Sequence, residues 1–186
     1  MQLNPSKIPV KILGIDPGSL VVGFCLLESK KVGTYNPSDF RMTDAGVLQA
    51  NKKLSHAHRI GELHQALYEL VVEIKPTHCI MEQAFYGVNA RSALRLGEAR
   101  GALVSALSRI GIVVEEITPT QVKKTVTGSG HADKNQVRLA IEALLRVKLG
   151  NLPLDASDAA AIALSYGLSL AMIPSQPEPL NARELR

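Results

Sequence analysis

The chain has 186 residues, of which 46% are hydrophobic and 20% are charged, a balance typical of one folded globular domain. Its net charge of +4 is small, so the arrangement of the charges says more about a polyanionic partner than their sum does. Two cysteines without a Cys/His cluster give no sign of a zinc site, and no signal peptide or bilayer-spanning apolar run is present, so we expect a cytoplasmic protein without membrane contact.

The chain is predicted to contain five apolar strands and five helices: three strands, then helix, strand, helix and strand, and then three helices. The strands are predicted at 10–15, 20–27, 41–48, 77–82 and 112–117. Four helices are predicted at 54–74, 89–110, 133–147 and 155–172. A fifth is predicted to begin at Thr118, whose N-cap is completed by Gln121 three residues on.

The order of these elements predicts an α/β fold. The first two strands form an antiparallel hairpin, and the strand–helix–strand crossovers that follow give parallel neighbours. We therefore predict a five-stranded mixed sheet with helices on both faces, as one domain over residues 10–172. Residues 1–9 are expected to be an N-terminal extension, and the Pro-rich tail 173–186 is expected to be disordered.

Four acidic residues fall where such a fold would bring them together. Asp16 ends the first strand and Glu82 the fourth, so as parallel neighbours they would share the carboxyl edge of the sheet. Asp155 and Asp158 lie three residues apart at the start of the last helix, on one of its faces. Clustered carboxylates repel one another unless cations lie between them, and oxygen ligands favour Mg²⁺ or Mn²⁺. The pattern therefore indicates metal-dependent phosphodiester cleavage, with two ions that activate water and stabilise the leaving oxygen.

Each acid alone also has a structural interpretation. Asp16 could nucleate the Asp-Pro-Gly turn that follows it. Asp155 as an N-cap and Asp158 in the first turn are what any helix start favours. A position on an edge strand would explain Glu82. Only their joint occurrence favours a metal site.

Basic residues follow the acid-bearing fourth strand in three helical segments. They are Arg91, Arg95, Lys123, Lys124, Lys134 and Arg138. They form either ordinary solvated helix faces or a rim that contacts phosphates, and their arrangement favours the rim. Phe85, in the turn after Glu82, either anchors that turn to the core or stacks on an unpaired base.

The helix over 89–110 carries small residues at a spacing of four: Ala93, Gly97, Gly101 and Ser105. Glycine within a helix costs about 1 kcal/mol relative to alanine, so we expect another backbone to approach this stripe. That backbone belongs either to the sheet beneath or to a second subunit, and a two-fold dimer would suit the cutting of symmetric DNA.

Four segments of the chain resemble RuvC-type Holliday junction resolvases, in that family's order and spacing. They are LGIDPGS (13–19), IMEQAFYGVNARSALRLGEARG (80–101), QVKKTVTGSGHADKNQV (121–137) and LDASDAAAIALS (154–165). The resemblance runs from about residue 10 to residue 171. It departs from the family at the N-terminal extension, at Arg91 and at His131.

The resemblance implies a ribonuclease H-like fold and Mg²⁺-dependent cutting of four-way DNA junctions in recombination and repair, with Mn²⁺ as a substitute and two ions bound per site with DNA. The catalytic and metal-binding acids of the family match Asp16, Glu82, Asp155 and Asp158. Its base-contacting aromatic matches Phe85, and its basic contacts match Lys123 and Lys134. We add Asn89, Arg91 and Lys124 as predicted DNA contacts. The family also implies a homodimer, here through the helix over 89–110, and a branch-migration motor as partner.

Three other functions stay open at this point. A non-catalytic junction-binding scaffold would share the fold, and Mg²⁺-dependent nicking of a junction separates it from a resolvase. A ribonuclease of the same fold would cut an RNA–DNA hybrid instead. LGIDPGS also resembles actin-like ATPases, although 186 residues leave no room for their two-domain plan.

Overall fold

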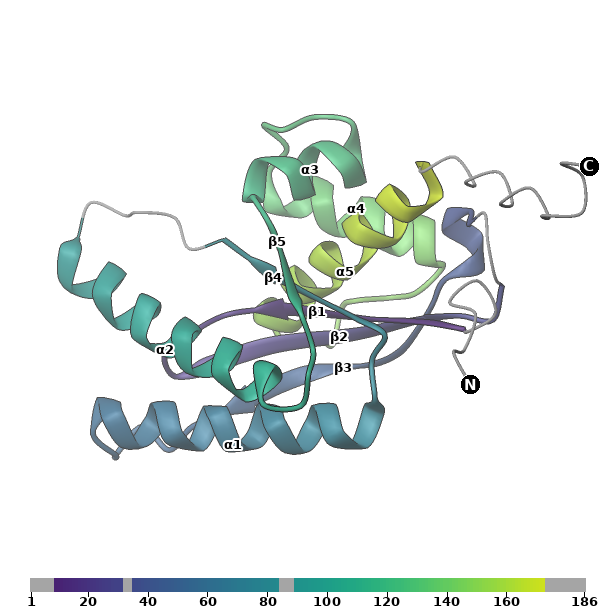
Figure 1. Cartoon of the computed structure of the whole chain (residues 1–186). Coiled ribbons are helices and arrows are strands. Elements are labelled where there is room, and N and C mark those ends of the chain that lie inside the picture. The colour runs from purple at the N-terminus through teal and green to yellow at the C-terminus, as the bar shows by residue number, and fades with distance from the viewer. Residues whose placement is uncertain (1–8, 32–34, 84–88, 173–186) are drawn as a thin grey trace, which may run out of the picture.

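The computed structural model describes residues 9–31, 35–83 and 89–172. Its strands form one sheet in the order β3-β2-β1-β4-β5 (Figure 1). They are β1 (Val10–Asp16), β2 (Val21–Ser29), β3 (Arg41–Gln49), β4 (His78–Glu82) and β5 (Val114–Ile117). The pairs β1–β2 and β2–β3 are antiparallel, whereas β1–β4 and β4–β5 are parallel. The predicted mixed sheet is confirmed. The predicted tail and all but Pro9 of the predicted extension lie outside the described residues.

Helices cover both faces of this sheet (Figure 1). One face carries α1 (His56–Ile74) and α2 (Ala90–Ser108), and the other carries α3 (Pro119–Thr127), α4 (Lys134–Leu145) and α5 (Leu154–Met172); a short 3-10 helix, η2 (Pro37–Asp39), precedes β3. Alternate residues of β1 serve the two layers, because successive strand side chains point to opposite faces. Leu13 and Ile15 pack with Leu67 of α1, whereas Ile12 packs with the α5 layer.

The capping signals of the sequence fix several helix ends. Thr118 and Gln121 form the predicted capping box of α3. The helix α2 ends at Ser108 and β5 begins only at Val114, so the predicted helix and strand were each two residues too long there. Gly111 has φ 77°, a left-handed conformation suited to glycine, and it turns the chain between them.

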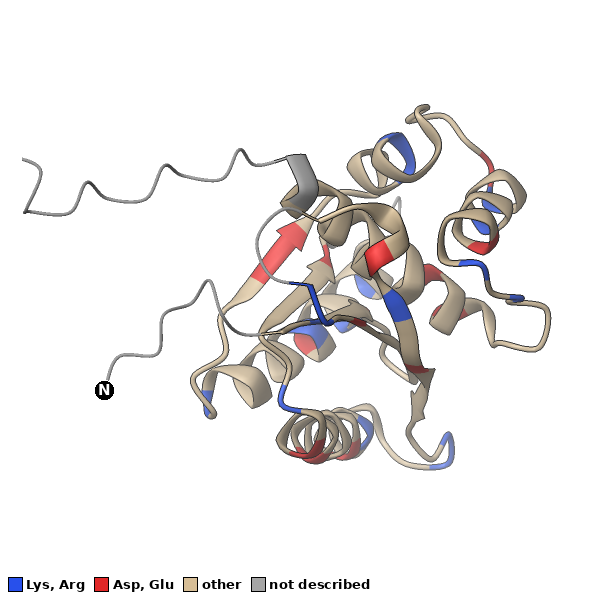
Figure 2. Ribbon diagram, turned by 90° about the vertical axis from the view of Figure 1, so that its right-hand side faces the viewer, with Lys and Arg blue, Asp and Glu red and all other residues tan. Residues whose placement is uncertain are grey.

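Charge is mixed over the side of the molecule where β1 begins. Acidic and basic residues both occur along the ribbon of this side (Figure 2). Within the described ranges, none of the helices is both long enough and apolar enough to cross a membrane. The strands β1 and β4 are parallel, and both finish on the opposite side of the molecule.

Candidate active site

Asp16 and Glu82 lie at the carboxyl ends of neighbouring parallel strands. Ile15 of β1 pairs with Met81 of β4, so the next residue of each strand is an acid at the same edge. The strand β4 also pairs with β5, so Glu82 is not on an edge strand, and that explanation of its position is wrong.

The first turns of α5 lie against the sheet because β1 and β2 have glycines where the helix crosses them. A Cβ atom on Gly23 would lie 2.0 Å from the carbonyl oxygen of Asp155. A Cβ atom on Gly14 would lie 2.3 Å from the carbonyl oxygen of Ala159. Gly23 also pairs with Asp16 across the β1–β2 hairpin. The glycines thus place Asp155 beside the strand that carries Asp16.

The last helix begins one residue earlier than predicted, at Leu154. The Ser157 N–H donates to the carbonyl of Pro153, so the first helical hydrogen bond starts from the proline. The residue whose carbonyl accepts the first helical hydrogen bond is the N-cap, so Pro153 occupies that position. Asp155 therefore lies in the first turn, and its predicted role as the N-cap is wrong.

The four predicted acids influence one another electrostatically. Burial and, after it, the negative charges of Glu82, Asp158 and Asp155 together raise the pKa of Asp16 from 3.8 to about 7. Burial, followed by the charge of Asp158, also raises the pKa of Glu82. Repulsion between carboxylates makes the ionised state costly unless a cation compensates it. The structure therefore brings together the acids that lie more than 130 residues apart in sequence.

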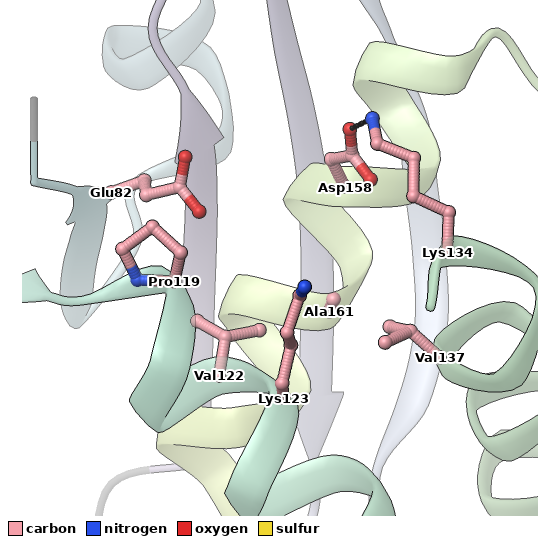
Figure 3. A pocket seen from close by; sticks show the side chains of 8 residues that line it. All are labelled: Glu82, Pro119, Val122, Lys123, Lys134, Val137, Asp158 and Ala161. Carbon is pink, nitrogen blue, oxygen red and sulfur yellow. Dashed lines mark hydrogen bonds and ion pairs between the residues drawn. The ribbon is translucent and has the colours of Figure 1, made fainter. Parts of the chain in front are cut away.

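Lys134, at the start of α4, supplies one such cation. Its Nζ atom lies 2.8 Å from Oδ2 of Asp158. Both residues line a pocket of about 230 Å³ that also contains Glu82 and Lys123 (Figure 3). In Figure 3 the carboxylate of Asp158 meets Lys134 on one side of the pocket, and Glu82 faces the pocket from the other side. Two of the lysines predicted to form a phosphate-contacting rim, Lys123 and Lys134, thus line the same pocket as Glu82 and Asp158.

The donor chemistry of this edge fits a hard divalent cation. Carboxylate oxygens are the ligands that Mg²⁺ and Mn²⁺ prefer. Asp16 is buried and is repelled by the other acids, so its ionised form would be stabilised most by a bound cation. As the described side chains stand, no three acidic, histidine or cysteine groups are close enough to enclose an ion. The two findings agree, because carboxylates beyond ligand distance still interact through their charges.

The other predicted contacts occupy different positions. Arg91 and Lys124 are exposed on α2 and α3. The side chain of Asn89 accepts hydrogen bonds from the N–H groups of Arg91 and Ser92, so it caps α2. Phe85 lies outside the described residues. Sequence reasoning missed the roles of Gly14 and Gly23, although glycine within an apolar strand is itself a signal of close backbone approach.

Comparison with known proteins shows which family the chain resembles. The family model described as "Crossover junction endodeoxyribonuclease RuvC" matches residues 12–166. A protein of that name from Chlorobium phaeovibrioides is 37% identical over 82% of this chain and 78% of its own length. Another, from Geobacter metallireducens, is 38% identical over 88% of this chain and 95% of its own. The solved structure of Thermus thermophilus RuvC in complex with a Holliday junction substrate is 27% identical, with a TM-score of 0.79 over 90% of this chain and 99% of that chain.

Proposed function

This chain belongs to the RuvC family of crossover junction endodeoxyribonucleases, and we propose that it resolves four-way (Holliday) DNA junctions by paired, metal-dependent phosphodiester hydrolysis. The observation that carries the proposal is a group of interacting acids at one sheet edge, beside lysines able to contact phosphate. Cutting two opposed strands to leave 5′-phosphate and 3′-hydroxyl ends would give products that a ligase can seal. Such an activity serves recombination and DNA repair.

The acids divide into two pairs by their positions. Asp16 and Glu82, on adjacent strand ends, would hold or bridge the metal ions, and Asp155 and Asp158 would complete their coordination from α5. Two bound Mg²⁺ ions, or Mn²⁺ in their place, would supply an activated water and stabilise the leaving oxygen. The strands and the helix hold the acids on elements whose positions the core fixes, as a preorganised site requires.

The lysines nearest the acids would position the DNA. Lys123 and Lys134 line the same pocket as Glu82, so a phosphate held by either ammonium would lie beside the carboxylates. Lys124, Arg91 and Asn89 would contact DNA farther out, and we propose that Phe85 stacks on a base at the crossover. Phosphate contacts carry most of the affinity and little sequence selectivity.

A homodimer through α2 is the arrangement that the small-residue stripe supports. A Cβ atom on Gly97 or Gly101 would meet no atom within 4 Å in the described part of the chain, so these glycines do not serve packing against the chain's own sheet there. Leu94, on the same helix, is 65% exposed. A second copy of α2 would cover this surface and give a two-fold enzyme for a nearly two-fold substrate. We propose a branch-migration motor as a further partner.

Cleavage of a synthetic four-way junction tests the function directly. We expect paired nicks in Mg²⁺ and none in EDTA, with little cleavage of linear duplex or of an RNA–DNA hybrid. Junction binding without nicking would leave only the scaffold, and preferential cutting of the hybrid would indicate a ribonuclease. In either case the proposal fails.

A further inference from the structure

The ion pair between Lys134 and Asp158 places a cation of the protein itself on a proposed metal ligand. The Nζ–Oδ2 distance of 2.8 Å is that of a charge-assisted hydrogen bond. The interaction joins α4 to α5, and the two residues are 24 positions apart in the chain. Lys134 also lowers the pKa of Asp16 and of Glu82, so its charge reaches the strand-end acids too.

This pairing turns the carboxylate of Asp158 towards Lys134 and not towards Glu82. In Figure 3 its carboxylate meets Lys134, and Glu82 lies across the pocket. In the same state no three possible ligands among the described residues come close enough to enclose an ion. A divalent ion that uses Asp158 must therefore displace the ammonium group or accept a like charge beside it.

We propose that Lys134 competes with the metal ion for Asp158, so that the protein binds divalent ions weakly until DNA phosphate draws the lysine away. This inference rests on the proposed metal-dependent function and adds that DNA and metal bind cooperatively. Lys134 is suited to the exchange because its side chain is 75% exposed and can turn to a phosphate without unpacking the core.

The size of the effect follows from the exposure of the pair. Partly exposed ion pairs contribute at most about 1 kcal/mol, which corresponds to roughly a fivefold change in an equilibrium constant. Removing the repulsion between the ammonium and the ion adds to this. We therefore expect divalent ions to bind about five- to tenfold more tightly, without DNA, when the charge of Lys134 is removed.

The test is a titration of the full-length protein with Mn²⁺ alone, with free Mn²⁺ measured by electron paramagnetic resonance. Lys134→Met should lower the Kd about five- to tenfold relative to the wild type. Lys124→Met is the matched control, because it removes the same charge from the exposed surface of α3 outside the pocket. Its Kd should stay within about twofold of the wild-type value.

Lys134→Gln provides a second variant in case the methionine disturbs folding, and the rise of the melting temperature with Mg²⁺ gives an independent readout. An unchanged or higher Kd in both Lys134 variants would overturn the proposal. An equal gain in Lys124→Met would overturn it too, because the effect would then be one of net charge. If the wild-type protein cleaves junctions but neither Lys134 variant binds metal more tightly, only this inference fails. If the wild-type protein does not cleave junctions, the proposed function fails.

Discussion

Replacing Asp16 by asparagine should stabilise the folded protein in metal-free buffer, and the gain should grow with pH. The carboxyl group has a folded-state pKa of about 7 against an ordinary value of 3.8, because it is buried among other acids. The folded state therefore binds the proton more tightly than the unfolded state does. The stability that this group contributes is fully present below about pH 4 and is lost as the pH rises to 7.

The magnitude follows from the same two values. Each pKa unit corresponds to about 1.4 kcal/mol, so ionised Asp16 lowers the free energy of unfolding by about 4 kcal/mol above pH 7. Part of that loss is already present at pH 5. The difference between Asp16→Asn and the wild type should therefore increase by roughly 2–3 kcal/mol between pH 5 and pH 8.

Urea denaturation in EDTA at these two pH values measures the difference. Asp44→Asn, which changes an exposed aspartate on β3, is the control and should show no comparable pH-dependent gain. At pH 8 Mg²⁺ should stabilise the wild type more than Asp16→Asn and so narrow the gap, while the variant no longer cuts junctions. A gap that is equal at pH 5 and pH 8 would refute the assignment of Asp16 to a buried, repelling carboxylate cluster.

Three further predictions address other parts of the site. Glu82→Gln should abolish nicking and leave junction affinity within about threefold of the wild type by gel shift in Ca²⁺; normal nicking would remove Glu82 from the catalytic set. Gly23→Ala should lower the free energy of unfolding by about 1–3 kcal/mol and slow cleavage, because its Cβ would meet the Asp155 carbonyl, whereas Gly61→Ala, with open space around it, should not destabilise the protein. Gly101→Glu should convert a dimer to monomers in sedimentation velocity; an unchanged dimer would place the interface elsewhere.

The strand ends that carry Asp16 and Glu82 could be predicted from sequence because their signals are local. An apolar run that stops at an acid identifies Asp16 and Glu82, and right-handed crossovers then make the two strands neighbours. The start of α5 was misjudged by one residue because Asp155 is a good N-cap by type, and the sequence does not show that Pro153 takes that place. The ion pair of Lys134 with Asp158 was not predictable, since side-chain directions depend on how α4 packs beside α5.

Asp155 and Asp158 owe their positions to the contact of the α5 backbone with the sheet, and not to their own side chains. On β1, Gly14 lets the backbone of α5 approach at Ala159 and Ala163, so the helix lies closer to the sheet than any larger side chain would allow. That packing stabilises an edge where ionised Asp16 costs stability when no cation is bound. The distance between helix and sheet therefore fixes where Asp155 and Asp158 stand. It follows that a methyl group at Gly14 should weaken metal binding even though every proposed ligand is still present.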